Sequence, residues 1–152
     1  MAFPFTPEHQ MLREMARDFT NAEIRPLAPS IDKNECIPPA LLKKIGEVGL
    51  MGTAIPEEYG GGGFGKVGFC IAQEEVSRVC GSTAATIGAH QSIGAQGILN
   101  GGSEALKKKY LPRLASGEMI AAFALTEADA GSDSFNLSTR AEKKGDKWIL
   151  NG

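Results

Sequence analysis

Cysteine and histidine are scarce in this 152-residue sequence, and their scarcity excludes several classes of site. The three cysteines, Cys36, Cys70 and Cys80, show no CxxC spacing, so neither a disulfide framework nor a zinc site is predicted. The two histidines, His9 and His90, have no local carboxylate spacing that would complete a metal site, and nothing orients a Cys–His nucleophilic pair. We therefore expect no metal, and we interpret the cysteines as small core residues or isolated thiols.

An excess of positive charge and a long apolar run are also missing. Sixteen Lys and Arg residues against 18 Asp and Glu residues give a formal net charge of −2, which provides no electrostatic reason to expect nucleic acid or an anionic membrane as a partner. No run of about 18 apolar residues exists, and the first residues lack a basic segment followed by an apolar one. We expect a cytoplasmic protein with no membrane span. The hydrophobic share, 42%, is enough for one core.

What the sequence does contain is a series of helical patterns. Thr6 as N-cap and Pro7 begin the first helix, which reaches about Ile24, where Pro26 and Pro29 end it. A second helix starts at Pro38-Pro39 and ends at Gly49, and Gly46 inside it implies close packing or an early end. The apolar residues expected to face the core from these two helices are Met11, Leu12, Met15 and Phe19, then Leu41, Leu42, Ile45 and Val48.

The glycine run Gly60–Gly65 resembles a phosphate loop only in composition. No Lys-Ser/Thr pair follows it and no hydrophobic strand precedes it, so we predict a flexible connection instead. A helix from about Lys66 to Val79 follows and Gly81 stops it. Its inward residues are expected to be Phe69, Cys70, Val76 and Val79.

The next helix, from Ser82 or Thr83 to about Leu99, is almost without charge. Such a helix is expected to be buried on most sides, and its small residues let neighbours or a ligand approach closely. Ser103-Glu104 caps a further helix, in which Lys107–Lys109 form a solvated face and which Pro112 interrupts.

The stretch Phe123–Asp133 separates these helical patterns from a strand-like region with a hairpin turn at Gly145-Asp146. Phe123-Ala124-Leu125 is short and apolar, so we expect an extended edge whose backbone groups can pair with a flat heterocycle. Thr126 adds a hydroxyl. Gly131 is expected to turn at positive φ, Ser132 to offer a hydroxyl to a phosphate, and Asp133 to cap the turn. The alternative is an ordinary Gly-Ser-Asp turn between strands.

This stretch resembles a known family signature. Leu125-Thr126-Glu127, followed after two residues by Ala130-Gly131-Ser132-Asp133, is similar to the signature of the acyl-CoA dehydrogenase family. Tyr59-Gly60-Gly61, Tyr110–Glu118 and Trp148–Gly152 resemble the same family in its order and spacing, so the resemblance covers nearly the whole chain. Ala128-Asp129 replaces the Glu-Pro that is frequent in the family, which makes this turn less rigid.

The resemblance implies a mainly α fold: an N-terminal helical bundle over 1–118, followed over 119–152 by the first strands of a truncated, β-barrel-like middle domain. It also implies that the chain is the N-terminal part of a longer, FAD-dependent enzyme that dehydrogenates an acyl-CoA thioester between its α and β carbons. By the resemblance, Phe123, Leu125 and Thr126 would meet the pyrimidine edge of the flavin, and Gly131 and Ser132 its pyrophosphate. Ser132 would also meet the CoA portion. The family's catalytic base lies in a C-terminal domain outside this chain, so we assign no catalytic residue here, and Glu127 is expected to be structural.

By the same resemblance the uncharged helix would line the acyl pocket, with Ala85, Thr86, Ala89 and Ile93 on one side. Gly88–Gly94 is most similar to very-long-chain members, which favours medium-to-long substrates. Alternatively, the small residues only allow close helix packing.

The resemblance has further implications for the whole protein. It implies an electron-transfer flavoprotein as electron acceptor, a role in β-oxidation of fatty acids and a homodimer or homotetramer. Two other functions stay open: an acyl-CoA oxidase that passes electrons to oxygen, and a non-catalytic helical interaction module.

Overall fold

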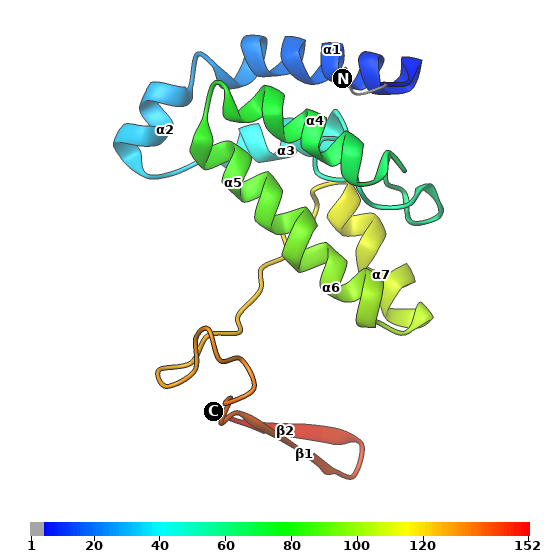
Figure 1. The fold of residues 1–152 in the computed structure, drawn as a ribbon, viewed down its shortest axis with the longest axis vertical. Helices are drawn as coiled ribbons and strands as arrows, with labels where there is room; N and C mark the ends of the chain where they lie inside the picture. The colour runs from blue at the N-terminus through cyan, green and yellow to red at the C-terminus, as the bar shows by residue number, and fades with distance from the viewer. Residues whose placement is uncertain (1–4) are drawn as a thin grey trace. The chain divides into compact units, whose positions relative to one another are not determined.

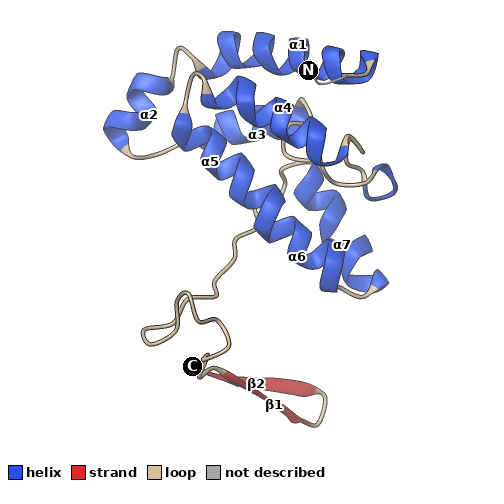
Figure 2. Cartoon of the chain, in the orientation of Figure 1, coloured by secondary structure: helices blue, strands red, loops and turns tan. Residues whose placement is uncertain are grey.

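The computed structural model describes residues 5–152, which divide into two compact units between Ala122 and Phe123. The first unit is helical and the second contains the two strands (Figure 2). The fold is mainly helical with a small antiparallel sheet, as the sequence predicted.

The helical unit consists of seven α-helices joined by shorter π and 3-10 turns (Figure 1). Their bounds are α1 (Pro7–Phe19), η1 (Thr20–Ile24), α2 (Ala28–Asn34), α3 (Pro39–Glu47), η2 (Glu57–Tyr59), α4 (Gly65–Ser77), α5 (Gly81–Ala89), η3 (His90–Ala95), α6 (Gln96–Gly101) and α7 (Glu104–Ala115). Elements α5, η3 and α6 run on as one long helix (Figure 1), so the uncharged helix of the sequence is continuous through a π-helical turn.

Most helices begin and end at the residues at which the sequence predicted their ends. The Thr6 side chain accepts a hydrogen bond from the His9 backbone and His9 reciprocates, a capping box that fixes the start of α1. Gly49, at φ 84°, ends the turn after α3 as expected. The first helix reaches Ile24 through η1, as predicted, but a separate helix that was not predicted, α2, follows with Pro29 in its first turn, where a missing N–H costs nothing. One expectation was wrong, because α7 continues through Pro112 to Ala115.

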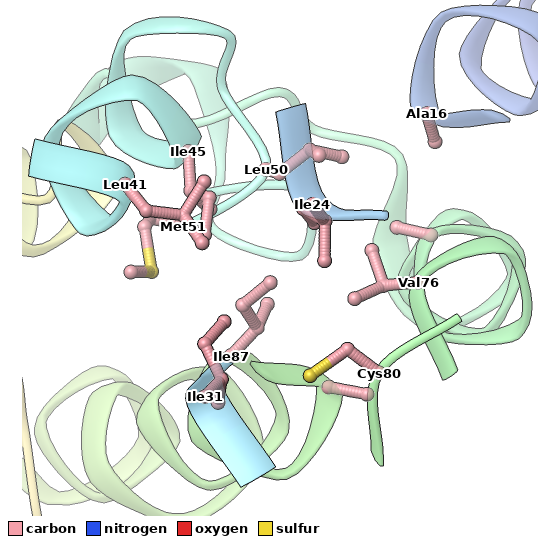
Figure 3. Packing of buried hydrophobic residues seen from close by; sticks show 12 residues of the cluster. Ala16, Ile24, Ile31, Leu41, Ile45, Leu50, Met51, Val76, Cys80 and Ile87 are labelled. Atoms are coloured by element: carbon pink, nitrogen blue, oxygen red, sulfur yellow. The ribbon is translucent and has the colours of Figure 1, made fainter. Parts of the chain in front are cut away.

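The main core lies where α4 packs against α1 and α5. Figure 3 shows Ile24, Val76 and Ile87 converging there from three elements. The buried hydrophobic residues of this core are Ala16, Ile24, Ile31, Leu41, Ile45, Leu50, Met51, Ala72, Val76, Cys80, Ala84 and Ile87. A second cluster, around Ile55, Tyr59, Leu111 and Leu114, joins η2 to α7.

Two predicted core residues are on the surface instead. Met11 is exposed on α1 and Cys70 is exposed on α4, because the buried sides of these helices are centred on Leu12 and on Ile71. Of the other thiols, Cys36 is exposed and Cys80 is buried.

The glycine-rich loop before α4 is tightly bonded rather than flexible. The amides of Gly60, Gly61, Gly62, Gly63 and Phe64 each donate to a backbone carbonyl within the segment from Gly52 to Glu57. Their N–H groups are therefore already used, which agrees with the prediction that this loop is not a phosphate loop.

Gly46, inside α3, marks a close approach between segments. A Cβ built at this position would collide with the carbonyl oxygen of Ser116 and would lie 3.1 Å from the Gly117 Cα. The close-packing explanation of this glycine is confirmed, since α3 does not end there.

In the second unit, β1 (Arg140–Lys144) and β2 (Lys147–Asn151) form an antiparallel hairpin. Ala141 pairs with Leu150, and Gly145 provides the positive φ of the turn, 61°. Both strands are exposed throughout. Within residues 5–152, no helix combines the length and the apolar character needed to cross a bilayer.

Candidate functional site

The segment Phe123–Thr126 is exposed and has no regular secondary structure. The expected strand is absent because no neighbouring segment among the described residues pairs with it, and a strand is defined by such pairing. Phe123 and Leu125 are 55% and 42% exposed. No hydrogen bond within the described chain engages the backbone of residues 122–126, so their N–H and C=O groups are open to a ligand.

Glu127 closes the loop that follows this segment. Its Oε2 accepts hydrogen bonds from the backbone N–H and the hydroxyl of Ser138, both at 2.7 Å, and its Oε1 accepts from the Thr139 N–H at 3.0 Å. Because these donors favour the ionised form, the hydrogen bonds from Thr139 and Ser138 lower the pKa of Glu127 to about 2. The carboxylate thus ties together two points eleven residues apart, in agreement with the structural role expected for it.

The loop's turn chemistry differs from the prediction at two residues. Gly131 has no positive φ, because the bend is made by reciprocal backbone bonds between Glu127 and Ala130, at 2.9 and 3.3 Å, before the chain reaches Gly131. Asp133 caps with its backbone carbonyl, which accepts from the Asn136 N–H at 3.2 Å, rather than with its carboxylate. Gly131 and Ser132 are exposed, and a Cβ built at Gly131 would meet no atom within 4 Å.

The uncharged helix has one exposed side. Ala85, Ala89 and Ile93 are all exposed and follow one another at four-residue spacing, so this face is the side of the helix that the rest of the chain does not cover. Thr86 is half-buried beside them. It lines a cavity of about 630 Å³ together with Asp32, Glu35 and Ser82, and its hydroxyl donates to the Ser82 carbonyl at 3.0 Å.

Two buried polar residues in η3, His90 and Gln91, were not singled out from the sequence. Gln91 accepts hydrogen bonds from the Thr53 hydroxyl and the Ala54 N–H, and donates to the Leu50 carbonyl at 3.0 Å. His90 contacts the Leu114 carbonyl through Nε2 and the Ala121 N–H through Nδ1, both at 3.0 Å. The available signal was two adjacent large polar side chains in a helix without charged residues.

Glu75 was also missed. Its side chain is only 2% exposed, yet it forms a bidentate pair with Arg17 on α1, at 2.8 and 3.0 Å, and a further pair with Arg78 at 3.0 Å. The hydrogen bond from Arg17 is the main cause that lowers the pKa of Glu75. This cluster joins α1 to α4 and is a structural feature.

The exposed groups between Phe123 and Ser132 fit what a flavin dinucleotide requires. An aromatic ring, unpaired backbone donors and acceptors, and the Thr126 hydroxyl suit a flat heterocycle with hydrogen-bonding edges, and the Ser132 hydroxyl suits a phosphate oxygen. Groups of this kind would form one wall of such a site.

Comparisons with known proteins identify the family of this chain. Residues 6–118 match the family described as "Acyl-CoA dehydrogenase, N-terminal domain". Over 152 residues, the chain is 43% identical to a short-chain specific acyl-CoA dehydrogenase of Clostridium acetobutylicum, covering 100% of this chain and 40% of that protein. The chain spans about two fifths of the length of the curated relatives it matches.

Solved structures show the same relationship. A glutaryl-CoA dehydrogenase in complex with glutaryl-CoA aligns with a TM-score of 0.91 at 42% identity, covering 100% of this chain and 39% of that one. An acyl-CoA dehydrogenase of Bacillus anthracis complexed with FAD aligns with a TM-score of 0.86 at 41% identity, covering 97% of this chain and 26% of that one. By its sequence and its fold, this chain belongs to the acyl-CoA dehydrogenase family.

Proposed function

We propose that this chain is the N-terminal part of an FAD-dependent acyl-CoA dehydrogenase that oxidises an acyl-CoA thioester between its α and β carbons. The observation that carries the proposal is the open backbone of residues 122–126, followed directly by a loop that Glu127 holds closed. A ligand can pair with such a segment without first breaking bonds within the protein.

Phe123, Leu125 and Thr126 contact the pyrimidine edge of the flavin in this proposal. Gly131 and Ser132 contact the pyrophosphate, and Ser132 also the CoA portion. Their exposure supports the assignment, as does the absence of a side chain at Gly131, which leaves room for an anion to approach the backbone. FAD, when bound, supplies the hydride acceptor for the β carbon, and the α-proton goes to a carboxylate outside residues 1–152.

The exposed helix face made by Ala85, Ala89 and Ile93 is proposed to line the acyl pocket, with Thr86 at its edge. An apolar surface on a helix suits a hydrocarbon chain, because each buried methylene contributes about 0.8 kcal/mol. Small side chains at Ala85 and Ala89 leave depth for medium-to-long acyl groups. An electron-transfer flavoprotein is the proposed electron acceptor, and the enzyme is proposed to act as a homodimer or homotetramer in fatty-acid β-oxidation.

Substitutions in the full-length enzyme test the flavin and CoA assignments. Thr126→Ala and Ser132→Ala each remove one hydroxyl, so each should weaken FAD or acyl-CoA binding about 2- to 10-fold. Ser134→Ala makes the same change two residues from Ser132 and should leave both affinities unchanged. FAD affinity is measured by flavin absorbance during titration of the apoenzyme, and acyl-CoA affinity by perturbation of the flavin spectrum.

Unchanged affinities in both Thr126→Ala and Ser132→Ala would leave the ordinary-turn interpretation standing. A full-length protein that takes up no FAD would instead identify the chain as an interaction module. Stoichiometric oxygen consumption during acyl-CoA turnover, without an added electron acceptor, would assign the protein to the oxidases.

A further inference from the structure

The segment that leaves α7 is held against the helical unit at a small number of points. The Met119 N–H donates to the Arg113 carbonyl at 3.0 Å, and Arg113 pairs with Glu118 at 2.7 Å. Ala121 is then bound to His90, its N–H donating to Nδ1 at 3.0 Å. Ala121 is the last residue before the open segment 122–126 whose backbone is bonded, so His90 is the final anchor of the chain before the proposed flavin contacts.

The partners of His90 determine which of its ring nitrogens carries hydrogen. The Leu114 carbonyl can only accept, so Nε2 must donate to it, while the Ala121 N–H can only donate, so Nδ1 must accept. The ring is therefore neutral with its proton on Nε2. Its exposure is 0%, and burial is the largest cause that lowers its pKa, partly opposed by backbone hydrogen bonds to Leu114 and Met51.

Gly94, in the same helix as His90, also positions Ala121. Gly94 lies four positions after His90, and a Cβ built on it would collide with the Ala121 Cβ and lie 3.0 Å from the Ala121 carbonyl carbon. Ala121 therefore packs directly against the backbone of η3, in space that only a glycine leaves. His90 and Gly94 together form what we call the Ala121 seat.

We propose that His90 is a positioning residue for the flavin: through the Ala121 seat it holds the point at which the chain leaves the helical unit, two residues before Phe123, so that the open segment is tethered at one end before the cofactor binds. The inference rests on the proposed function, since it assigns the flavin contacts to that segment. The energetic basis is pre-organisation, because a segment that is already held at one end loses less conformational freedom when the flavin binds.

Two substitutions of His90 in the full-length enzyme separate positioning from simple core filling. Asn carries its Oδ1 on Cγ, where His carries Nδ1, so His90→Asn keeps an acceptor for the Ala121 N–H. Gln places its amide nitrogen where Nε2 lies, so His90→Gln keeps the donor to Leu114 and loses the acceptor for Ala121. Gln is also closer to His in size, so it leaves the smaller cavity.

The two readouts should therefore rank the variants in opposite orders. His90→Gln should have the higher Tm of the two but a dissociation constant for FAD raised roughly 3- to 10-fold, whereas His90→Asn should stay within about 2-fold of the wild type. Hydrogen exchange of the Ala121 amide should accelerate in His90→Gln and stay slow in His90→Asn. Losses of FAD affinity that simply follow Tm in both variants would overturn the proposal.

Gly94→Ala tests the other half of the seat. The added methyl displaces Ala121, so FAD affinity should fall while the helix itself gains from replacing glycine. Gly101→Ala is the matched control, because a Cβ there would meet no atom within 4 Å. Equal FAD affinities in the two glycine variants would contradict the inference. A wild-type protein that binds no FAD would instead overturn the proposed function and, with it, the role given to His90.

Discussion

Glu127 is the residue on which the shape of the signature loop depends. Three hydrogen bonds converge on its carboxylate from Ser138 and Thr139, although the group lies at the surface. Its pKa, near 2, is below the ordinary 4.5, so the ionised form is favoured in the folded loop. The contribution of this carboxylate to loop stability is complete above about pH 4.5 and is lost as the pH falls through about 2.

Glu127→Gln should loosen the loop from Ala128 to Leu137. The amide keeps one acceptor oxygen but loses the charge and presents NH₂ donors to N–H groups that are donors themselves. Near neutral pH, we expect the amides of Ser138 and Thr139 to exchange faster in the variant than in the wild type. Near pH 2, where the wild-type carboxylate also loses its charge, the difference between the two proteins should shrink. Glu142→Gln, an exposed change on β1, is the control and should leave exchange at these two amides unaltered. An unchanged exchange rate in Glu127→Gln would contradict the closing role.

The sequence indicates which residues are chemically suited to the proposed site, but not how the chain holds them. Thr126 and Ser132 could be named because hydroxyls beside a glycine turn are a local pattern. His90 could not be assigned to Ala121, 31 positions away, because no local pattern encodes that contact. The turn at Gly131 was wrong for a local reason, since reciprocal bonds between Glu127 and Ala130 make the bend before the chain reaches the glycine.

At the scale of elements, the pairing of α1 with α4 depends on a buried charge cluster. Glu75 on α4 is surrounded by Arg13 and Arg17 of α1 and by Arg78, while its neighbour Glu74 has a side chain that is 61% exposed. A buried carboxylate in an apolar interface is tolerated only because the guanidinium groups are in place.

Glu75→Gln should therefore lower the free energy of unfolding by about 1.5 to 3 kcal/mol, because a neutral amide cannot pair with three guanidinium groups and its buried NH₂ would face N–H donors. Glu74→Gln, next to it and paired only at the surface, should cost less than about 1 kcal/mol. Urea denaturation of both variants measures the difference, and similar costs for the two would show that burial of Glu75 does not strengthen its pairs.

Helix boundaries were easier to predict than helix faces. Thr6 with Pro7, and Gly49 after α3, are local signals that the structure confirms. The face of α4 was misassigned because burial of Glu75, rather than Cys70, depends on arginines that α1 supplies from about 60 positions away. The helix α2 was missed because a proline usually indicates the end of a helix, whereas Pro29 lies in a first turn, where proline is favourable.

The exposed face of α5 and η3 provides a test of the acyl pocket. Ala89→Glu in the full-length enzyme places a longer, charged side chain on that face, so the preferred acyl chain should become shorter. The measurement is kcat/KM across a series of saturated acyl-CoA substrates of increasing length. Ala105→Glu makes the same change at an exposed alanine of α7, on a different helix, and serves as the control. A profile that does not move in Ala89→Glu would show that the small residues serve helix packing.

At the scale of the whole molecule, this chain spans about two fifths of its curated relatives and supplies one wall of the proposed flavin site. We predict that residues 1–152 alone show no dehydrogenase activity, because the proposed catalytic base lies outside them, and that they bind FAD weakly. Contacts on one side of a cofactor cannot replace an enclosing pocket. A purified 1–152 chain that retains yellow flavin and reduces a dye with acyl-CoA would refute this.

The π-helical turn His90–Ala95 has a consequence for how relatives of this chain should align. Such a turn holds one residue more than the α-turn it replaces, so it amounts to a single-residue insertion absorbed within a continuous helix. The extra residue lets consecutive side chains, His90 and Gln91, reach inward to two separate backbone segments. A relative with a regular α-turn here should show a one-residue gap between the positions of Ala89 and Gln96, and should keep only one of these two anchors.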